Sequence, residues 1–191
     1  MKKLIKLNWL LVALLATVSL GCDKDDPDPV NEEELITKVE LTFTSTGPIN
    51  ETIVASWEDT DGDGGSDPVI DDIVLTESNT YDLTLAFFNG AVNITPEIKA
   101  EARDHQLFFE ISSSLTLLVE YNDTETDYTI DGQDYPVGLK NNASAGNAST
   151  GTLTVILVHE PAKFQTGVAE GDQTNAGGEE DVRVTFNVTI Q

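Results

Sequence analysis

The sequence predicts an all-β fold: a single antiparallel β-sandwich (Ig-like or jelly-roll-like) or a closed barrel, with one short crossing helix. Apolar and polar residues alternate with a period of two in many short runs from Leu35 onward, which is typical of strands with one solvated face. Stretches rich in Gly, Asn, Ser and Asp separate these runs. Hydrophobic residues make up 39% of the chain, enough for the core of one domain of about 155 residues.

The clearest strand is the last run, in which Val182, Val184 and Phe186 share one face while Arg183 and Thr185 lie opposite. The first run places Leu35, Val39, Leu41 and Phe43 on one face in the same way. The predicted strands are LITKVELTFT (35–44), Thr52–Trp57, Ile70–Thr76, TYDLTLAFF (80–88), Leu107–Ser112, LTLLVEY (115–121), GTLTVILVHE (151–160) and DVRVTFNVTI (181–190).

One segment, TPEIKAEARDHQ, interrupts this pattern and predicts a short helix. Thr95 is a suitable N-cap, and Pro96 suits the first helical position. Ile98, Ala102 and His105 would share one helical face. The stretches 131–150 and 161–180 contain few apolar residues and are expected to form long loops.

The first 21 residues have the composition of an export signal: a basic start, an apolar stretch from Trp9 to Val18, and small residues after it. The apolar stretch is shorter than the roughly 20 residues that span a bilayer. Cys22, the single cysteine, follows directly. The segment resembles a bacterial lipoprotein signal, although Ser19 stands where leucine is usual. The resemblance implies that Cys22 becomes the acylated first residue of the mature protein, anchored in the membrane.

The next segment, DKDDPDPVNEEE, combines many acids with two prolines and is expected to form an extended tether. Its Lys24-Asp25-Asp26 resembles the tag of surface-exposed lipoproteins of Bacteroidota. That resemblance implies the outer face of the outer membrane, with the periplasmic face as the alternative. The predicted organisation is a lipoprotein signal (1–21), an acidic tether (22–34) and a β-sandwich domain (35–191).

The chain is strongly acidic, with 34 acidic and 10 basic residues and a formal net charge of -24. A surface of this charge repels nucleic acid and anionic lipid and attracts cations. A single cysteine cannot form an internal disulfide. We therefore expect no nucleic-acid partner and no disulfide framework.

The segment EDTDGDGGSD contains a candidate calcium loop. Its acids alternate, and a glycine follows at the position where a calcium loop turns sharply. The position of the usual bidentate glutamate is Ile70, so the pattern is incomplete. The alternative is an acidic hairpin turn built on Asp-Gly pairs. The candidate calcium ligands are Asp59, Asp61, Asp63, Gly65 and Asp67.

The two histidines, His105 and His159, form a candidate transition-metal site. Imidazole is a common ligand of zinc, copper and iron, and Asp104 or Glu160 could complete a minimal site. The histidines lie far apart in sequence without a spacing motif, so two unrelated surface residues at element boundaries are the favoured interpretation. The acids of NAGGEED (175–181) could also serve a cation, although a β-turn is the favoured interpretation.

The sequence lacks the common catalytic motifs: a nucleophile elbow, a phosphate-binding glycine–lysine loop and a zinc-protease helix. We therefore predict no catalytic residues and a non-enzymatic protein. A glycosidase-type carboxylate pair is the remaining enzymatic alternative, because acids are so numerous.

The leader and tether, together with EDTDGDGG, DHQLFF, LTVILVHEP and AGGEEDVRVTFNVTIQ, resemble a group of small acidic lipoproteins of Bacteroidota. Some of these are called type 1 periplasmic binding fold proteins, a fold of alternating strands and helices that this sequence does not predict. The resemblance implies partnership with an outer-membrane transporter. The first hypothesis is thus a non-enzymatic, lipid-anchored binding module that serves nutrient or metal uptake. The alternative is a calcium-stabilised structural or adhesion module.

Overall fold

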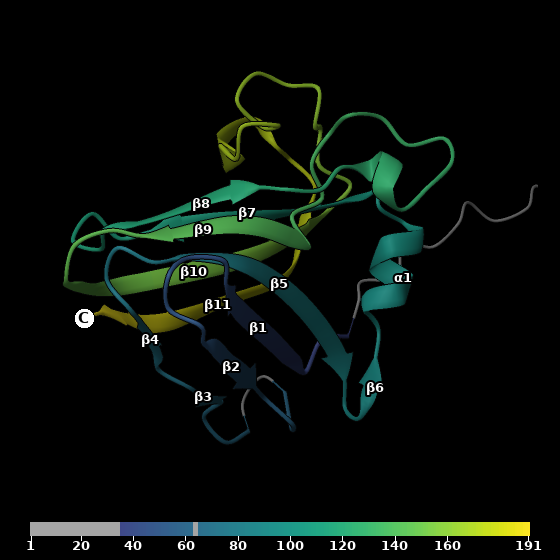
Figure 1. The fold of residues 1–191 in the computed structure, drawn as a ribbon. Helices are drawn as coiled ribbons and strands as arrows, with labels where there is room; N and C mark the ends of the chain where they lie inside the picture. Colours follow the sequence, from purple (N-terminus) through teal and green to yellow (C-terminus); the bar gives the residue numbers. More distant parts are fainter. Residues whose placement is uncertain (1–34, 63–64) are drawn as a thin grey trace, which may run out of the picture. The chain divides into compact units, whose positions relative to one another are not determined.

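The computed structural model describes residues 35–62 and 65–191, and in this part the chain folds into two β-sheets that pack face to face (Figure 1). Apolar side chains of both sheets form one buried core, which includes Leu41 and Leu85 from one sheet and Val155 and Phe186 from the other. The predicted β-sandwich is confirmed, because the described strands do not close into a barrel. The predicted signal, Cys22 and the predicted tether lie outside the described residues.

The larger sheet has the strand order β3-β2-β1-β5-β9-β8, with β6 paired to β5. All its pairs are antiparallel. Its strands are β1 (Lys38–Ser45), β2 (Thr52–Glu58), β3 (Val69–Ile70), β5 (Thr80–Asn89), β6 (Val92–Asn93), β8 (Leu117–Tyr121) and β9 (Lys140–Ala145).

The smaller sheet has the order β4-β11-β10-β7. Its strands are β4 (Ile73–Leu75), β7 (His105–Ile111), β10 (Ser149–His159) and β11 (Glu179–Ile190). β10 lies antiparallel to both β7 and β11, but β4 runs parallel to β11. The pair of β4 and β11 is thus the one parallel pair among the described strands, and it lies where the chain enters the second sheet from the first.

The alternation that predicted the strands also describes the core. In β5, Tyr81, Leu83, Leu85 and Phe87 are buried, whereas their neighbours Thr80, Asp82 and Thr84 are exposed. In β11, every second residue from Val182 to Ile190 is buried. Leu35 is an exception to the prediction: it precedes β1 and is 67% exposed, and the adjacent Ile36 is buried instead.

The predicted strand Ile70–Thr76 is in fact two strands of different sheets. Asp71 separates them: its backbone N–H donates to the Ser56 carbonyl, and its carboxylate accepts from the Ser56 N–H and hydroxyl. These bonds hold the end of β3 against β2 while the chain crosses to β4. A continuous strand is incompatible with this crossing.

The predicted loop 131–150 contains a strand, β9, that the composition concealed. The sequence KNNASA has no large apolar residue, yet Asn141, Ala143 and Ala145 face inward and are buried. Small residues suffice here because β9 is paired on both sides, with β5 and with β8. The pairing, rather than the side chains, thus determines this strand.

The helix α1 (Thr95–Ala100) is shorter than predicted, and its N-cap is Ile94 rather than Thr95. The Thr95 hydroxyl instead accepts a hydrogen bond from the Phe87 N–H, and the Asn93 side chain accepts one from the Thr95 N–H. Ile98 is buried as expected. His105 does not belong to the helix, because it is the first residue of β7.

Two long connections lie beyond the strand ends (Figure 1): the segment 122–139, which contains η1 (Glu125–Asp127), and the segment 160–178, which contains η2 (Gln173–Asn175). Val168 and Ala176 of the second connection pack on Phe108, Ile156 and Val158, which face outward from the smaller sheet. The expected loop 161–180 is therefore present up to the start of β11, and it covers apolar residues that would otherwise be exposed.

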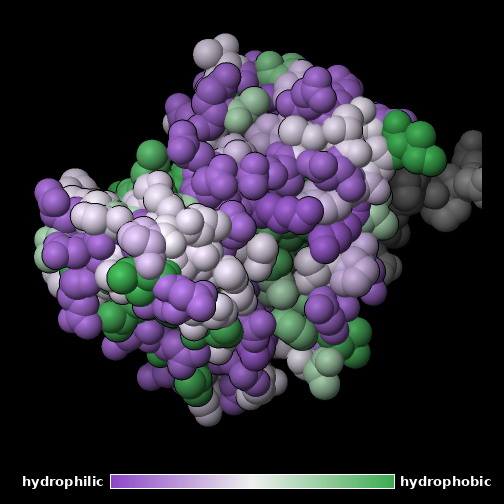
Figure 2. Space-filling model, in the orientation of Figure 1, coloured by the Kyte–Doolittle hydropathy of each residue, from purple (hydrophilic) through white to green (hydrophobic). Residues whose placement is uncertain are grey.

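The surface in the view of Figure 2 is mainly hydrophilic, and its apolar side chains are scattered in small groups. This agrees with the strongly acidic composition of the chain. Over residues 35–62 and 65–191, no helix is long and apolar enough to cross a bilayer.

Candidate metal centre

The two histidines that lie far apart in sequence are direct neighbours in the fold. His105 begins β7 and His159 ends β10, and the antiparallel register places the two residues opposite each other. Their ring centroids are 4.6 Å apart, and the ring planes meet at 70°. Both residues have the same phase as the inward-facing Leu107 and Leu157, so the pair lies at the end of the core between the sheets.

A β-bulge brings Asp181 to this pair. Leu157 pairs with Val182, but the next pair joins Val158 to Glu180, so Asp181 is an extra residue in β11. In a regular strand Asp181 would point to the face opposite Val182. A bulge re-aims the side chain of the extra residue. The Asp181 side chain is consequently fully buried beside the histidines.

Two glycines position the chain before this bulge. Gly177 and Gly178 both have positive φ values, of 57° and 72°, which residues with a Cβ adopt at a cost. A Cβ at Gly178 would also collide with the carbonyl oxygen of His159. The glycine pair therefore permits the close approach of the start of β11 to the end of β10.

The potential metal-ligating atoms of His105, His159 and Asp181 all lie within 4.8 Å of one another. His105 Nε2 is 3.6 Å from Asp181 Oδ2, and neither of these side chains is exposed to solvent. When ligand atoms lie about 2.0–2.2 Å from one tetrahedral zinc ion, the distance between two of them is similar to the distance between His105 Nε2 and Asp181 Oδ2. Small side-chain movements would therefore bring all three donors onto a single ion.

A backbone carbonyl determines which ring nitrogen of His105 carries the proton. His105 Nδ1 lies 3.1 Å from the carbonyl oxygen of Glu101, and since a carbonyl only accepts, Nδ1 must carry the proton. The Nε2 lone pair then faces Asp181. Burial lowers the pKa of His105 to about 4, so this ring is neutral near pH 7. A carbonyl that orients the second nitrogen of a histidine is a recurring feature of metal-ligating imidazoles.

The second imidazole also presents a nitrogen to the interior. His159 Nδ1 is buried and makes no hydrogen bond within the part of the chain that the structure describes. Two imidazoles and one carboxylate suit a divalent ion of borderline softness such as Zn²⁺ or Cu²⁺, and they are also found on Fe²⁺. The fold and these residues together define a β-sandwich with a buried His₂Asp cluster between strand ends.

The two acids that the sequence offered as third ligands do not join the cluster. Asp104 and Glu160 extend the strand pairing, because the Glu160 N–H donates to the Asp104 carbonyl at 2.6 Å. Glu160 is exposed and has a positive φ of 51°. Asp181 was recognised only as part of the acidic stretch 175–181. Its one local signal is the Gly-Gly pair three residues before it.

The candidate calcium loop is described only in part, because Asp63 and Gly64 lie outside the described residues. Asp59 Oδ1 accepts a hydrogen bond from the Gly62 N–H at 2.9 Å, and Asp61 Oδ2 accepts one from Ser66 at 3.0 Å. The latter bond is the main cause of the lowered pKa of Asp61. These are the contacts of a self-capped acidic turn, and calcium binding stays a prediction.

No model of a known protein family matches the chain, and no curated protein matches it either.

Proposed function

We propose that this chain is a non-enzymatic, lipid-anchored binding module of the cell envelope, in which His105, His159 and Asp181 bind a divalent transition-metal ion. One observation carries the proposal. Three side chains of metal-ligating type, drawn from three strand ends, converge with their donor atoms within 4.8 Å at a buried position.

The surroundings of the cluster favour a cation of this class. The imidazoles supply nitrogen donors, which hard ions such as Ca²⁺ do not prefer. The chain contains one cysteine, Cys22, outside the described residues, so no thiolate of the domain competes for the ion.

The sequence supports the cellular context of the proposal. The lipoprotein-like signal and the acidic tether support a position of the domain at a membrane surface. The net charge of -24 raises the local concentration of cations around it. A metal-binding domain held there would serve an outer-membrane uptake system as an accessory protein.

The test is a titration of the full-length chain, purified in detergent and treated with chelator, with Zn²⁺, Cu²⁺ or Ca²⁺. We expect binding of one Zn²⁺ or Cu²⁺ per chain and a rise in melting temperature, because a ligand that binds only the native state stabilises it. The gain is about 2.7 kcal/mol at a hundredfold excess over Kd. Calorimetry gives the stoichiometry, and thermal melts give the stabilisation.

The variants His159→Ala and Asp181→Asn should abolish the zinc-induced rise, each compared with its own metal-free melt. Asp61→Ala is the matched control, because it removes an exposed acid of the 58–67 turn and should respond as the unmodified chain does. An equal zinc response in His159→Ala would refute the proposed site. A calcium response lost in Asp61→Ala would instead support the calcium-stabilised adhesion module.

A further inference from the structure

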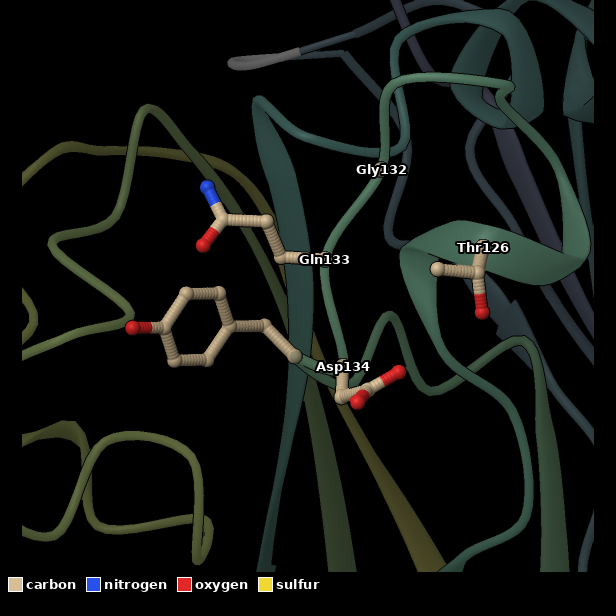
Figure 3. Close-up of a pocket in the computed structure, with 5 residues that line it drawn as sticks. Thr126, Gly132, Gln133 and Asp134 are labelled. Carbon is tan, nitrogen blue, oxygen red and sulfur yellow. The ribbon is translucent and has the colours of Figure 1, made fainter.

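A second feature, independent of the histidines, is a set of three adjoining cavities at the two long connections. One of about 490 Å³ is lined by Thr126 and residues 132–135. In Figure 3, the side chains of Asp134 and Thr126 lie on one side of the backbone of this segment, and the side chain of Gln133 lies on the other. A second, of about 430 Å³, lies between Tyr135 and residues of the segment 163–170. The third, of about 350 Å³, shares Asp134 and Ala169 with its neighbours. All three are open toward solvent, and their volumes fall in the range of small-molecule sites.

A buried ion pair holds the two connections together beneath these cavities. Lys163 Nζ lies 3.0 Å from Glu125 Oε1, and both side chains are about 3% exposed. Lys163 also donates to the Ala102 carbonyl, and the other Glu125 oxygen accepts from the Gln133 N–H. The Glu125 N–H in turn donates to the carbonyl of Tyr135. The walls of the cavities are thus fixed before any ligand arrives, which lowers the entropic cost of binding.

Two aromatic side chains line the 430 Å³ cavity. Tyr135 is partly exposed, and Phe164 is 73% exposed. Phe164 directly follows the buried Lys163, so the ion pair anchors the backbone next to an aromatic ring that contributes nothing to the core. An exposed ring on an anchored backbone provides a flat apolar surface for a ligand.

The polar residues around these rings both donate and accept hydrogen bonds. The side chains of Gln133 and Gln165 are amides, those of Thr126 and Thr166 are hydroxyls, and the acids add acceptors. The single cation among the lining residues is Lys163, which is buried in its ion pair. A ligand with several hydroxyl groups uses both donors and acceptors, whereas the carboxylates would repel an anion and a cation would leave the amide donors unused.

From these observations we infer that the cavities form a binding site for a neutral oligosaccharide, with Phe164 and Tyr135 as the surfaces on which sugar rings lie. The site is separate from the His105–His159–Asp181 cluster and does not require a metal ion. The residues that would fix the orientation of the sugar are Thr126, Gln133, Asp134, Gln165, Thr166 and Glu170.

The experiment is a calorimetric titration of the full-length chain in chelator with four neutral probes: cellohexaose, maltohexaose, xylohexaose and mannohexaose. We expect at least one to bind, and Phe164→Ala to weaken it at least tenfold. Phe164 is exposed, so its removal should leave the melting temperature unchanged. Ile130→Ala is the matched control, because Ile130 is a fully exposed apolar residue of the 122–139 connection that does not line these cavities, and it should bind as the unmodified chain does.

The inference is overturned if none of the four probes binds, or if the binding is unchanged in Phe164→Ala. Spermidine is titrated in parallel. Phe164-dependent binding of this polyamine without binding of any sugar would assign the site to a cationic ligand and would also overturn the inference. Because chelator is present throughout, these results do not depend on the outcome at the metal centre.

Discussion

Lys163 shows how much structure one buried side chain can organise. The side chain contacts the carboxylate of Glu125 and the carbonyl of Ala102, so it joins the segment after α1 to both long connections. Burial lowers the pKa of Lys163, and the hydrogen bond and charge of Glu125 oppose that effect. A buried pair of this kind gives little net stability but is costly to break on one side only.

We therefore expect Lys163→Met to destabilise the protein by about 3–5 kcal/mol, because it leaves the Glu125 carboxylate buried without its partner. Urea unfolding measures the loss. The double variant Lys163→Met/Glu125→Leu should recover a large part of it, because both charges are then absent. A single variant as stable as the unmodified chain would show that the pair does not hold the two connections together.

The residues of the candidate site differ in how well the sequence predicted them. Residue type identified His105 and His159, because imidazole is a common metal ligand, although the sequence placed His105 on the predicted helix and only His159 at a strand end. Their adjacency depends on the register between β7 and β10, which one sequence does not reveal. Asp181 was missed as a ligand because a strict period of two places it on the face opposite Val182, and the bulge reverses this.

Among the elements, β11 carries the feature most specific to the site. The bulge at Asp181 interrupts an otherwise regular pairing with β10 that extends over the whole strand. The extra residue shifts the register of the pairing by one position and directs the Asp181 carboxylate inward. Its value therefore lies in the placement of the side chain rather than in the stability of the sheet.

Deletion of Asp181 tests this interpretation of the bulge. Without the extra residue the strand can pair regularly, so we expect an unchanged far-ultraviolet circular dichroism spectrum together with a loss of zinc affinity of at least tenfold. Asp181→Asn is the companion variant, because it keeps the bulge and removes only the charge. Zinc binding by the deletion variant at unmodified affinity would exclude Asp181 as a ligand.

The elements also differ in how well the sequence predicted them. Strands with strict alternation, such as β5 and β11, were predicted closely because burial on one face determines both pattern and register. β9 was missed because its inward residues are small or polar and its stability comes from pairing on both sides. The split of 70–76 into β3 and β4 was missed because it depends on the bonds between Asp71 and Ser56.

At the scale of the whole molecule, the sequence predicts an acidic β-sandwich attached to a membrane through Cys22. We expect mass spectrometry of the natively expressed protein to find an acylated cysteine as the first residue. Cys22→Ser should move the protein from the membrane fraction to the soluble fraction, because two or three acyl chains supply a firm anchor at about 0.8 kcal/mol per buried CH₂. A free thiol without added acyl mass would contradict the anchor and the location.

X-ray absorption at the zinc edge of the full-length chain, loaded with one equivalent of Zn²⁺, shows whether His105, His159 and Asp181 bind the ion. We expect nitrogen and oxygen ligands at about 2.0–2.2 Å, with the scattering pattern of two imidazoles that falls to one in His159→Ala. A shell of oxygen atoms alone, or a spectrum unchanged in that variant, would contradict it.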